Sequence, residues 1–253
     1  MSPLAISTIV FTCVFTIALA GMFINARLPE HHLSKESTDV VKLTMGLIAT
    51  LAALVLGLLT SSAKSTFDLS NTEIQQAAAS SIQLDRALAN YGPETKLIRE
   101  QFKQIITARL HATWPDNDAP QINLDTPERL KVVEAVWGGI GRLSPQTDAQ
   151  SECKARAQQI GRELMAMRWL VFAQAKSPLP MPFMIVLAFW LCILFGGFGV
   201  LAPRNATVIA SIFLCALAVS GSIFLVLEMS DPLGGLIKVS SAPLQYAISE
   251  LGL

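Results

Sequence analysis

The chain has 253 residues, of which 52% are hydrophobic and 15% are charged. Soluble domains carry fewer apolar and more charged residues, so this composition excludes an ordinary soluble protein. The 19 basic and 19 acidic residues balance to a net charge of zero. This balance gives no electrostatic reason to expect nucleic acid or a strongly acidic substrate as a partner.

The apolar residues are concentrated in four uncharged stretches, each long enough to cross a bilayer as a helix of about 20 residues. These stretches are residues 1–26, 43–63, 177–203 and 205–227. Residues 17–21 resemble a signal-peptidase site, but no Lys or Arg precedes them and the apolar run continues past them. We therefore predict a retained first membrane helix over about residues 3–25.

The second span is predicted to continue into a long helical stalk outside the membrane, and the rest of the chain is organised around this rod. No Gly and no Pro occurs from residue 58 to residue 91. Because Gly and Pro are the strongest signals for helix termination, nothing in the sequence predicts a stop at the membrane surface. We expect one helix over about residues 40–91, amphipathic in its second half, with Asp85 and Arg86 on its polar surface.

Three further helices are predicted before the third span, because Pro, Gly and turn residues punctuate this region. The stalk ends at Gly92-Pro93, the next helix ends at Trp114-Pro115, the third starts at Asp125-Thr126-Pro127, and the last covers about residues 147–176. Leu97 is assigned to the apolar face of the helix after the stalk. No stretch alternates between apolar and polar residues over a useful length, so we expect no sheet.

The predicted fold is an all-α, polytopic membrane protein with four transmembrane helices in a 2+2 arrangement. The expected parts are helices 1 and 2 over residues 1–63, a helical domain over 64–176, helices 3 and 4 over 177–227, and an amphipathic tail over 228–253. With four spans, both termini and the helical domain share one side. The charges near the span ends do not decide which side. The size of the helical domain favours the cytoplasm.

Two sets of residues give the second span a distinct surface. Small residues recur on one face, which lets helices approach closely in lipid, at Gly46, Thr50, Ala53 and Gly57. Leucines form an adjacent stripe at Leu43, Leu47, Leu54 and Leu58. Two interpretations fit: the small residues pack while the leucines face lipid, or the stripe, with Thr50, lines a dewetting constriction at the axis of an oligomer.

The sequence has no Gly-rich phosphate loop, no HExxH and no nucleophile beside a base, so we predict that the chain is not an enzyme. The four cysteines have neither CxxC nor Cys/His spacing. This pattern favours a role as small buried hydrophobic residues over zinc binding or a disulfide framework.

Two groups of residues are candidate cation ligands, although no cofactor is otherwise expected. Glu228 and Asp231 follow the fourth span, and they could bind calcium through side chains and carbonyls or simply cap a turn. The adjacent His31 and His32 cannot lie on one helical face, and a polar loop explains them better than a metal site.

Three stretches carry specific motifs, and they are spread over nearly the whole chain. They are RLPEHHLS at residues 27–34, GLIATLAALVLG at residues 46–57 and DPLGGLIKVSSAP at residues 231–243. These motifs resemble a bacterial family of membrane proteins described as bestrophin-like. The resemblance to true bestrophins is more distant. It rests on the 2+2 plan with a helical insert and on Asp231-Pro-Leu-Gly234, which is similar to the Asn-Pro-Phe-Gly after the last bestrophin span.

Bestrophins are pentameric anion channels gated by calcium, with a hydrophobic neck on the second transmembrane helix. The resemblance therefore implies a homopentameric chloride channel of the bacterial inner (plasma) membrane, with cytoplasmic termini and its neck at the leucine stripe. Bestrophins follow the tail motif with a dense acidic run that binds calcium. Here the residues are Gly235-Leu-Ile-Lys238, a departure that removes the acidic ligands expected for calcium gating.

Two functions follow from the sequence. The leading hypothesis is a homo-oligomeric, anion-permeable pore lined by the second span, with the lipid bilayer, further copies of the chain and small inorganic anions as partners. The alternative is a non-conducting membrane scaffold or sensor whose helical domain binds a cytoplasmic partner. The absence of charged residues inside the four spans favours the alternative, because ion pathways commonly contain one.

Overall fold

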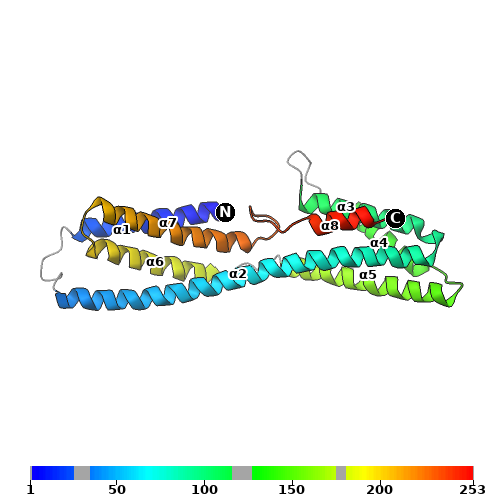
Figure 1. Cartoon of the computed structure of the whole chain (residues 1–253), viewed down its shortest axis with the longest axis horizontal. Helices are drawn as coiled ribbons and strands as arrows, with labels where there is room; N and C mark the ends of the chain where they lie inside the picture. Colours follow the sequence, from blue (N-terminus) through cyan, green and yellow to red (C-terminus); the bar gives the residue numbers. More distant parts are fainter. Residues whose placement is uncertain (1, 26–34, 116–126, 175–180, 253) are drawn as a thin grey trace. The chain divides into compact units, whose positions relative to one another are not determined.

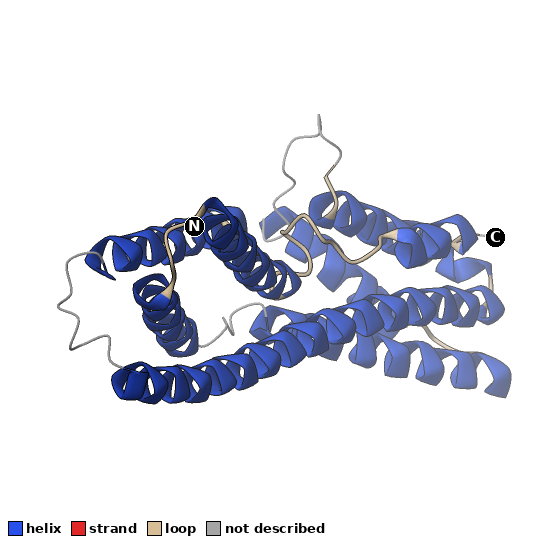
Figure 2. Ribbon diagram, turned by 60° about the vertical axis from the view of Figure 1, so that its left-hand side comes forward, coloured by secondary structure: helices blue, strands red, loops and turns tan. Residues whose placement is uncertain are grey.

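The computed structural model describes residues 2–25, 35–115, 127–174 and 181–252. All regular secondary structure in these ranges is helical (Figure 1, Figure 2), which confirms the all-α prediction for them. In chain order the helices are α1 (Pro3–Asn25), α2 (Lys35–Tyr91), the short 3-10 helix η2 (Pro93–Thr95), α3 (Lys96–Thr113), α4 (Pro127–Arg142), α5 (Asp148–Gln174), α6 (Met181–Leu201), α7 (Ala206–Met229) and α8 (Ala242–Glu250).

Four of these helices, α1, α2, α6 and α7, are long and apolar enough to cross a membrane, as the sequence predicts. The helix ends follow the predicted breaks. α3 ends at Thr113, directly before Trp114-Pro115, and α4 begins at Pro127. Proline fixes its own φ and lacks an N–H donor, so it is tolerated in the first turn of a helix but not in its interior.

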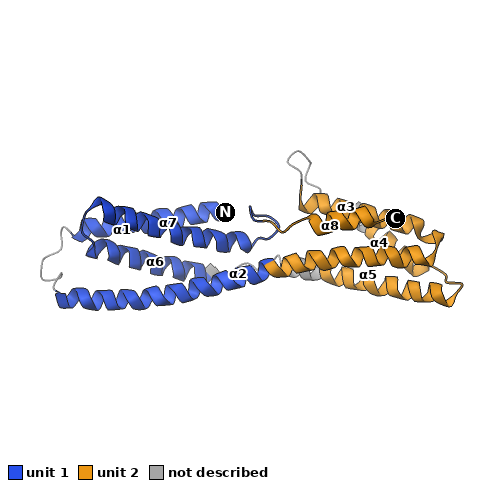
Figure 3. Cartoon of the chain, viewed as in Figure 1, with its two compact units in different colours: residues 1–67, 178–237 blue, residues 68–177, 238–253 orange. Residues whose placement is uncertain are grey.

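α2 is one uninterrupted helix of 57 residues, which confirms the prediction that the second span continues past the membrane. At about 1.5 Å per residue it extends for about 85 Å, far more than the hydrocarbon core of about 30 Å. The chain forms two compact units, and α2 contributes to both (Figure 3). Unit 1 consists of Met1–Phe67 and Pro178–Ile237, and unit 2 of Asp68–Ser177 and Lys238–Leu253. The predicted tail over residues 228–253 is therefore divided between the units.

In unit 1, α6 packs against α1 through glycines. Gly199 lies against the backbone of Ala18, and Gly21 lies against the backbone of Gly196 and Val200, so a Cβ at either glycine would overlap main-chain atoms. Helices in lipid gain little hydrophobic driving force from each other, and close backbone approach supplies the dispersion that holds them together. α7 completes the core, whose most buried side chains include Val14, Ala18, Leu187, Ala216 and Ile223.

Arg204, in the turn between α6 and α7, forms hydrogen bonds to the C-terminal end of α1. Its Nε and Nη2 donate to the carbonyl oxygen of Met22 at 2.9 and 2.7 Å, and Nη2 also donates to that of Phe23 at 3.1 Å. These carbonyls belong to the last turn of α1, where no intrahelical donor remains. Asn205 then starts α7, because its side chain accepts a hydrogen bond from the Val208 N–H at 2.8 Å.

Unit 2 is a helical bundle around an apolar core. Its most buried side chains include Leu84, Leu88, Phe102, Val136, Ile140 and Leu251. Trp137 of α4 lies over Gly161 of α5, where a Cβ would be 2.6 Å from the indole carbon Cζ3. The approach to α8 is fixed by Trp114, whose Nε1 donates to the Val239 carbonyl oxygen at 2.9 Å.

Two sequence predictions in unit 2 are wrong. Asp85, expected on the polar surface, is 2% exposed, and its carboxylate accepts two hydrogen bonds of 2.8 Å from Arg99 of α3. Leu97, expected in the core, is 64% exposed. The core face of α3 is set by Ile98, Phe102 and Ile106, and Leu97 is turned about 100° away from Ile98.

Candidate functional site

The predicted leucine stripe and small-residue face of α2 lie on the same, unpacked side of this helix. Leu43, Leu47, Leu54 and Leu58 are 76%, 64%, 60% and 62% exposed. Gly46, Thr50, Ala53 and Gly57 are also exposed. A Cβ built at Gly46 or Gly57 would meet nothing within 4 Å. The structure thus brings all eight residues together on one surface, which we call the open face of α2.

The opposite side of α2 packs into unit 1. Met45, Ala52, Leu59 and Ala63 are buried there, at the spacing of one helical stripe. Met45 contacts α6 at Gly197, where a Cβ would be 2.7 Å from the Met45 sulfur. α2 therefore has one side that belongs to its own chain, and its open face remains available for lipid, solvent or another chain.

The open face carries no formal charge. Residues 43–63 include no Asp, Glu, Lys or Arg. The Thr50 hydroxyl donates to the Gly46 carbonyl oxygen at 2.9 Å, so its hydrogen is used within the helix. Lys42, just before the face, pairs with Asp39 at 3.8 Å, and both side chains are more than 60% exposed. Such a surface can exclude water from a narrow passage, since leucine side chains offer it no hydrogen bonds.

The candidate cation ligands lie in a tight turn after α7. Glu228 is 2% exposed, and its Oε2 accepts hydrogen bonds from the backbone N–H groups of Leu236 and Ile237. Asp231 Oδ1 accepts from the Gly234 N–H at 3.1 Å. Both carboxylates therefore hold the turn through main-chain donors, and no group of three or more His, Cys, Asp or Glu able to hold a metal occurs among the described residues. Calcium binding at this turn stays a prediction.

Other candidate residues are placed as follows. His31 and His32 lie outside the described residues. The prediction that all four cysteines are buried is wrong for Cys13 and Cys215, which are exposed on α1 and α7. All four cysteines are free thiols, so the structure contains no disulfide between them. The run Phe195-Gly-Gly-Phe-Gly199 predicts that α6 either bends or packs closely on a neighbour, and the structure shows the close packing, with α1 as the partner that the sequence does not name. The role of Arg204 was not predicted, because a lone arginine in a loop carries no periodic signal.

Comparison with known proteins identifies the same architecture elsewhere. A family model described as the Bestrophin-like domain matches residues 12–244. The fold is also similar to crystal structures of a bacterial bestrophin homologue from Klebsiella pneumoniae that carry different point mutations. One has 14% sequence identity and a TM-score of 0.69, covering 99% of this chain and 97% of that chain. Another has 13% identity and a TM-score of 0.66, covering 96% and 97%. No curated protein matches the chain.

At such low identity the likeness to the solved structures establishes a shared helical fold and nothing finer. The family model is a separate observation, and it extends from the middle of α1 into α8. It therefore includes the second half of α1, the other three apolar helices, the helical insert and the turn after α7. The chain belongs to the bestrophin-like family.

Proposed function

We propose that the chain forms a homo-oligomeric ion channel in which the open face of α2 lines the pore. The carrying observation is the division of α2 into a side packed on its own chain and a side with four exposed leucines and a row of small residues. Membership of the bestrophin-like family supports a channel, because bestrophins place a hydrophobic neck on this helix. A pentamer in the bacterial inner membrane, with cytoplasmic termini, is the arrangement we propose by the same analogy.

The permeant ion we propose is a small anion such as chloride. Cation channels commonly use rings of Asp or Glu at their narrowest point. The open face has neither an acidic nor a basic residue between Leu43 and Ala63, so it has no ring selective for cations, and the preference for an anion is proposed by analogy with bestrophins. A neutral, leucine-lined constriction favours ions that shed their water at low cost, and chloride holds its water more weakly than the common divalent cations.

We propose further that conduction does not require calcium. Glu228 and Asp231 already accept backbone hydrogen bonds, and the residues after them are Gly235-Leu-Ile-Lys238 rather than an acidic run. Addition of a calcium chelator should leave the flux unchanged. Loss of flux on chelation, restored by added calcium, would instead place a cation at this turn.

The test is chloride flux into liposomes containing the purified protein, compared for the original chain, Leu54→Ala and Leu214→Ala. Leu54 lies on the open face, and Leu214 of α7 is a control of nearly equal exposure, at 63% against 60%. Truncation of a leucine at a dewetting constriction should admit water more readily, so Leu54→Ala should raise the flux several-fold while Leu214→Ala leaves it unchanged. Absence of flux from all three proteins, or an equal response to both substitutions, contradicts the proposal.

The alternative is a non-conducting scaffold or sensor. It is favoured by the lack of any Asp, Glu, Lys or Arg in the described parts of the spans, α1, residues 43–63, α6 and residues 206–227. Under this alternative the protein would assemble but lipid or packed side chains would fill its axis. Assembly into a stable oligomer without flux for any tested ion would support it.

A further inference from the structure

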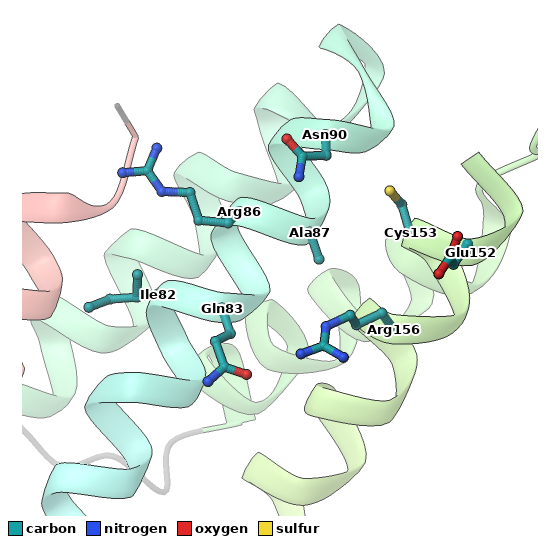
Figure 4. A pocket seen from close by; sticks show the side chains of 8 residues that line it. All are labelled: Ile82, Gln83, Arg86, Ala87, Asn90, Glu152, Cys153 and Arg156. Atoms are coloured by element: carbon teal, nitrogen blue, oxygen red, sulfur yellow. The ribbon is translucent and has the colours of Figure 1, made fainter. Parts of the chain in front are cut away.

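A groove opens between α2 and α5 in unit 2, with a volume of about 360 Å³ (Figure 4). Ile82 and Ala87 of α2 form part of its apolar lining. Polar side chains line it from both helices: Gln83 and Asn90 come from α2, and Arg156 comes from α5. The groove thus combines a guanidinium with two side-chain amides, all of which can donate hydrogen bonds.

Arg156 is a cation of this groove that forms no ion pair with an acid of the described residues. Arg86, the other arginine in the lining, has Glu250 of α8 at 3.5 Å. No ion pair joins Arg156 to an acidic side chain of the described residues, including Glu152, one turn earlier on α5. In Figure 4 the Arg156 side chain points across the groove toward Gln83, whereas Arg86 extends to the other side of α2. The positive charge of Arg156 is therefore presented to the space inside the groove.

We propose that this groove binds a small inorganic anion, held by the guanidinium of Arg156 and the side-chain amide N–H groups of Gln83, toward which Arg156 points. Arginine keeps its charge at every physiological pH and offers donors in a fixed planar arrangement, which suits an anion. Glu152 lies in the same lining, and its negative charge opposes large or multiply charged ligands. A monovalent ion such as chloride is the ligand that this balance of charges admits.

The site is separate from the open face of α2 and does not depend on conduction. All of its residues belong to unit 2, so binding can be measured on purified protein whether or not it carries current. Arg156 and Glu152 are exposed, so the binding should be weak and should fall as other anions compete. A method that detects rapid exchange of a weakly held ion is therefore needed.

The test is the line broadening of chlorine-35 NMR of chloride by the full chain in detergent, compared among matched variants. Arg156→Gln should remove the groove's share of the broadening, and Arg156→Lys, which keeps the charge, should retain part of it. Glu152→Gln should increase the broadening because it removes a repelling charge. Arg162→Gln is the control, since Arg162 is an exposed arginine of the same helix that does not line the groove.

Two results would overturn the proposal: equal broadening by Arg156→Gln and the original chain, or an equal loss of broadening in Arg156→Gln and Arg162→Gln.

A second experiment uses bromide soaked into crystals of the full chain, which locates the ion by its anomalous scattering. A peak within hydrogen-bond distance of Arg156, absent in Arg156→Gln, agrees with the proposal, and a groove without a peak contradicts it. Failure of the liposome experiment would leave these outcomes unaffected, so the two proposals can fail separately.

Discussion

Gly199 of α6 lies directly on the backbone of Ala18 of α1, so close that a Cβ at position 199 would overlap the Ala18 carbonyl group. Gly21 makes the reciprocal approach to Gly196 and Val200. The spacing of these two helices is therefore set by main-chain atoms rather than by interdigitating side chains. Neither helix can accept a larger residue there without moving, because the contacts are backbone and not the ends of flexible side chains.

Gly199→Ala should therefore separate α1 from α6 and destabilise the protein by about 1–3 kcal/mol, the range for an overpacked core. The measurement is thermal unfolding in detergent. Gly221→Ala is the matched control, because a Cβ at Gly221 of α7 would meet nothing within 4 Å. Equal unfolding temperatures for Gly199→Ala and the original chain would show that the crossing is looser than described.

The buried ion pair of unit 2 gives a second prediction. The Asp85 side chain is 2% exposed and that of Arg99 is 18% exposed. Removal of one charge leaves the other partly buried without compensation, so Asp85→Asn should cost about 2–4 kcal/mol, at the low end for buried pairs because Arg99 reaches solvent. Glu250→Gln, which breaks the more exposed pair with Arg86 in the same unit, should cost less than about 1 kcal/mol. Chemical unfolding of unit 2, followed by helical circular dichroism, measures both; similar losses would contradict the assignment.

The same pair makes a prediction about pH. The hydrogen bond to Asp85 raises the pKa of the Arg99 guanidinium above its ordinary value. A raised pKa in the folded state gives stability that is present below the unfolded pKa and is lost only as pH rises through the folded value. Arg99 therefore stays charged, and the difference in stability between the original chain and Asp85→Asn should not decline between about pH 7 and 10. A decline in this window would mean that Arg99 loses its proton far earlier than the geometry implies.

Tyr91, the last residue of α2, should make unit 2 sensitive to alkali. Burial, together with the nearby Glu94 carboxylate, raises the pKa of its phenol above 10.0. The unfolded chain then loses this proton first, so stability is lost as pH rises above about 10. Tyr91→Phe should remove that part of the pH dependence, while Tyr246→Phe, at an exposed position of α8, should retain it. Indistinguishable alkaline profiles for the two variants would contradict the prediction.

These examples show which features the sequence could predict. The four spans, the uninterrupted α2 and the breaks at Trp114-Pro115 and Pro127 follow from charge-free length and from proline, which act locally. The burial of Asp85 could not be predicted, because a lone Asp in an amphipathic helix is usually solvated. Its partner Arg99 lies across the turn at Gly92-Pro93, and only the packing of α3 on α2 brings the two together.

The candidate site likewise has features that the sequence predicts and features that depend on the fold. Periodicity placed Leu54 and Gly57 on neighbouring faces of α2, and both are exposed in the chain. The sequence left open whether Glu228 holds a cation or a turn. Glu228 accepts hydrogen bonds from Leu236 and Ile237, which lie eight and nine positions later in the sequence. These contacts form only because the turn after α7 folds back on itself, and no sequence pattern predicts that conformation. What covers the open face of α2 depends on other molecules, which the sequence of one chain does not describe.

The turn after α7 provides a further prediction. Glu228→Ala removes the side-chain acceptor of the Leu236 and Ile237 N–H groups, at a cost of about 1 kcal/mol, because both residues are exposed and water can replace the carboxylate. Glu228→Gln keeps a carbonyl oxygen at the same position and should cost less. Hydrogen–deuterium exchange should therefore quicken at Leu236 and Ile237 in Glu228→Ala more than in Glu228→Gln. Unchanged exchange in both variants would show that the carboxylate does not hold the turn.

The central claim is that the open face of α2 gathers copies of the chain around a shared axis. An electron cryomicroscopy map of the purified protein in lipid nanodiscs tests it directly. We predict a closed ring of chains with Leu43, Leu47, Leu54 and Leu58 of every copy around a central, lipid-free passage. A single chain, or an oligomer whose α2 leucines face the surrounding lipid, would contradict the account.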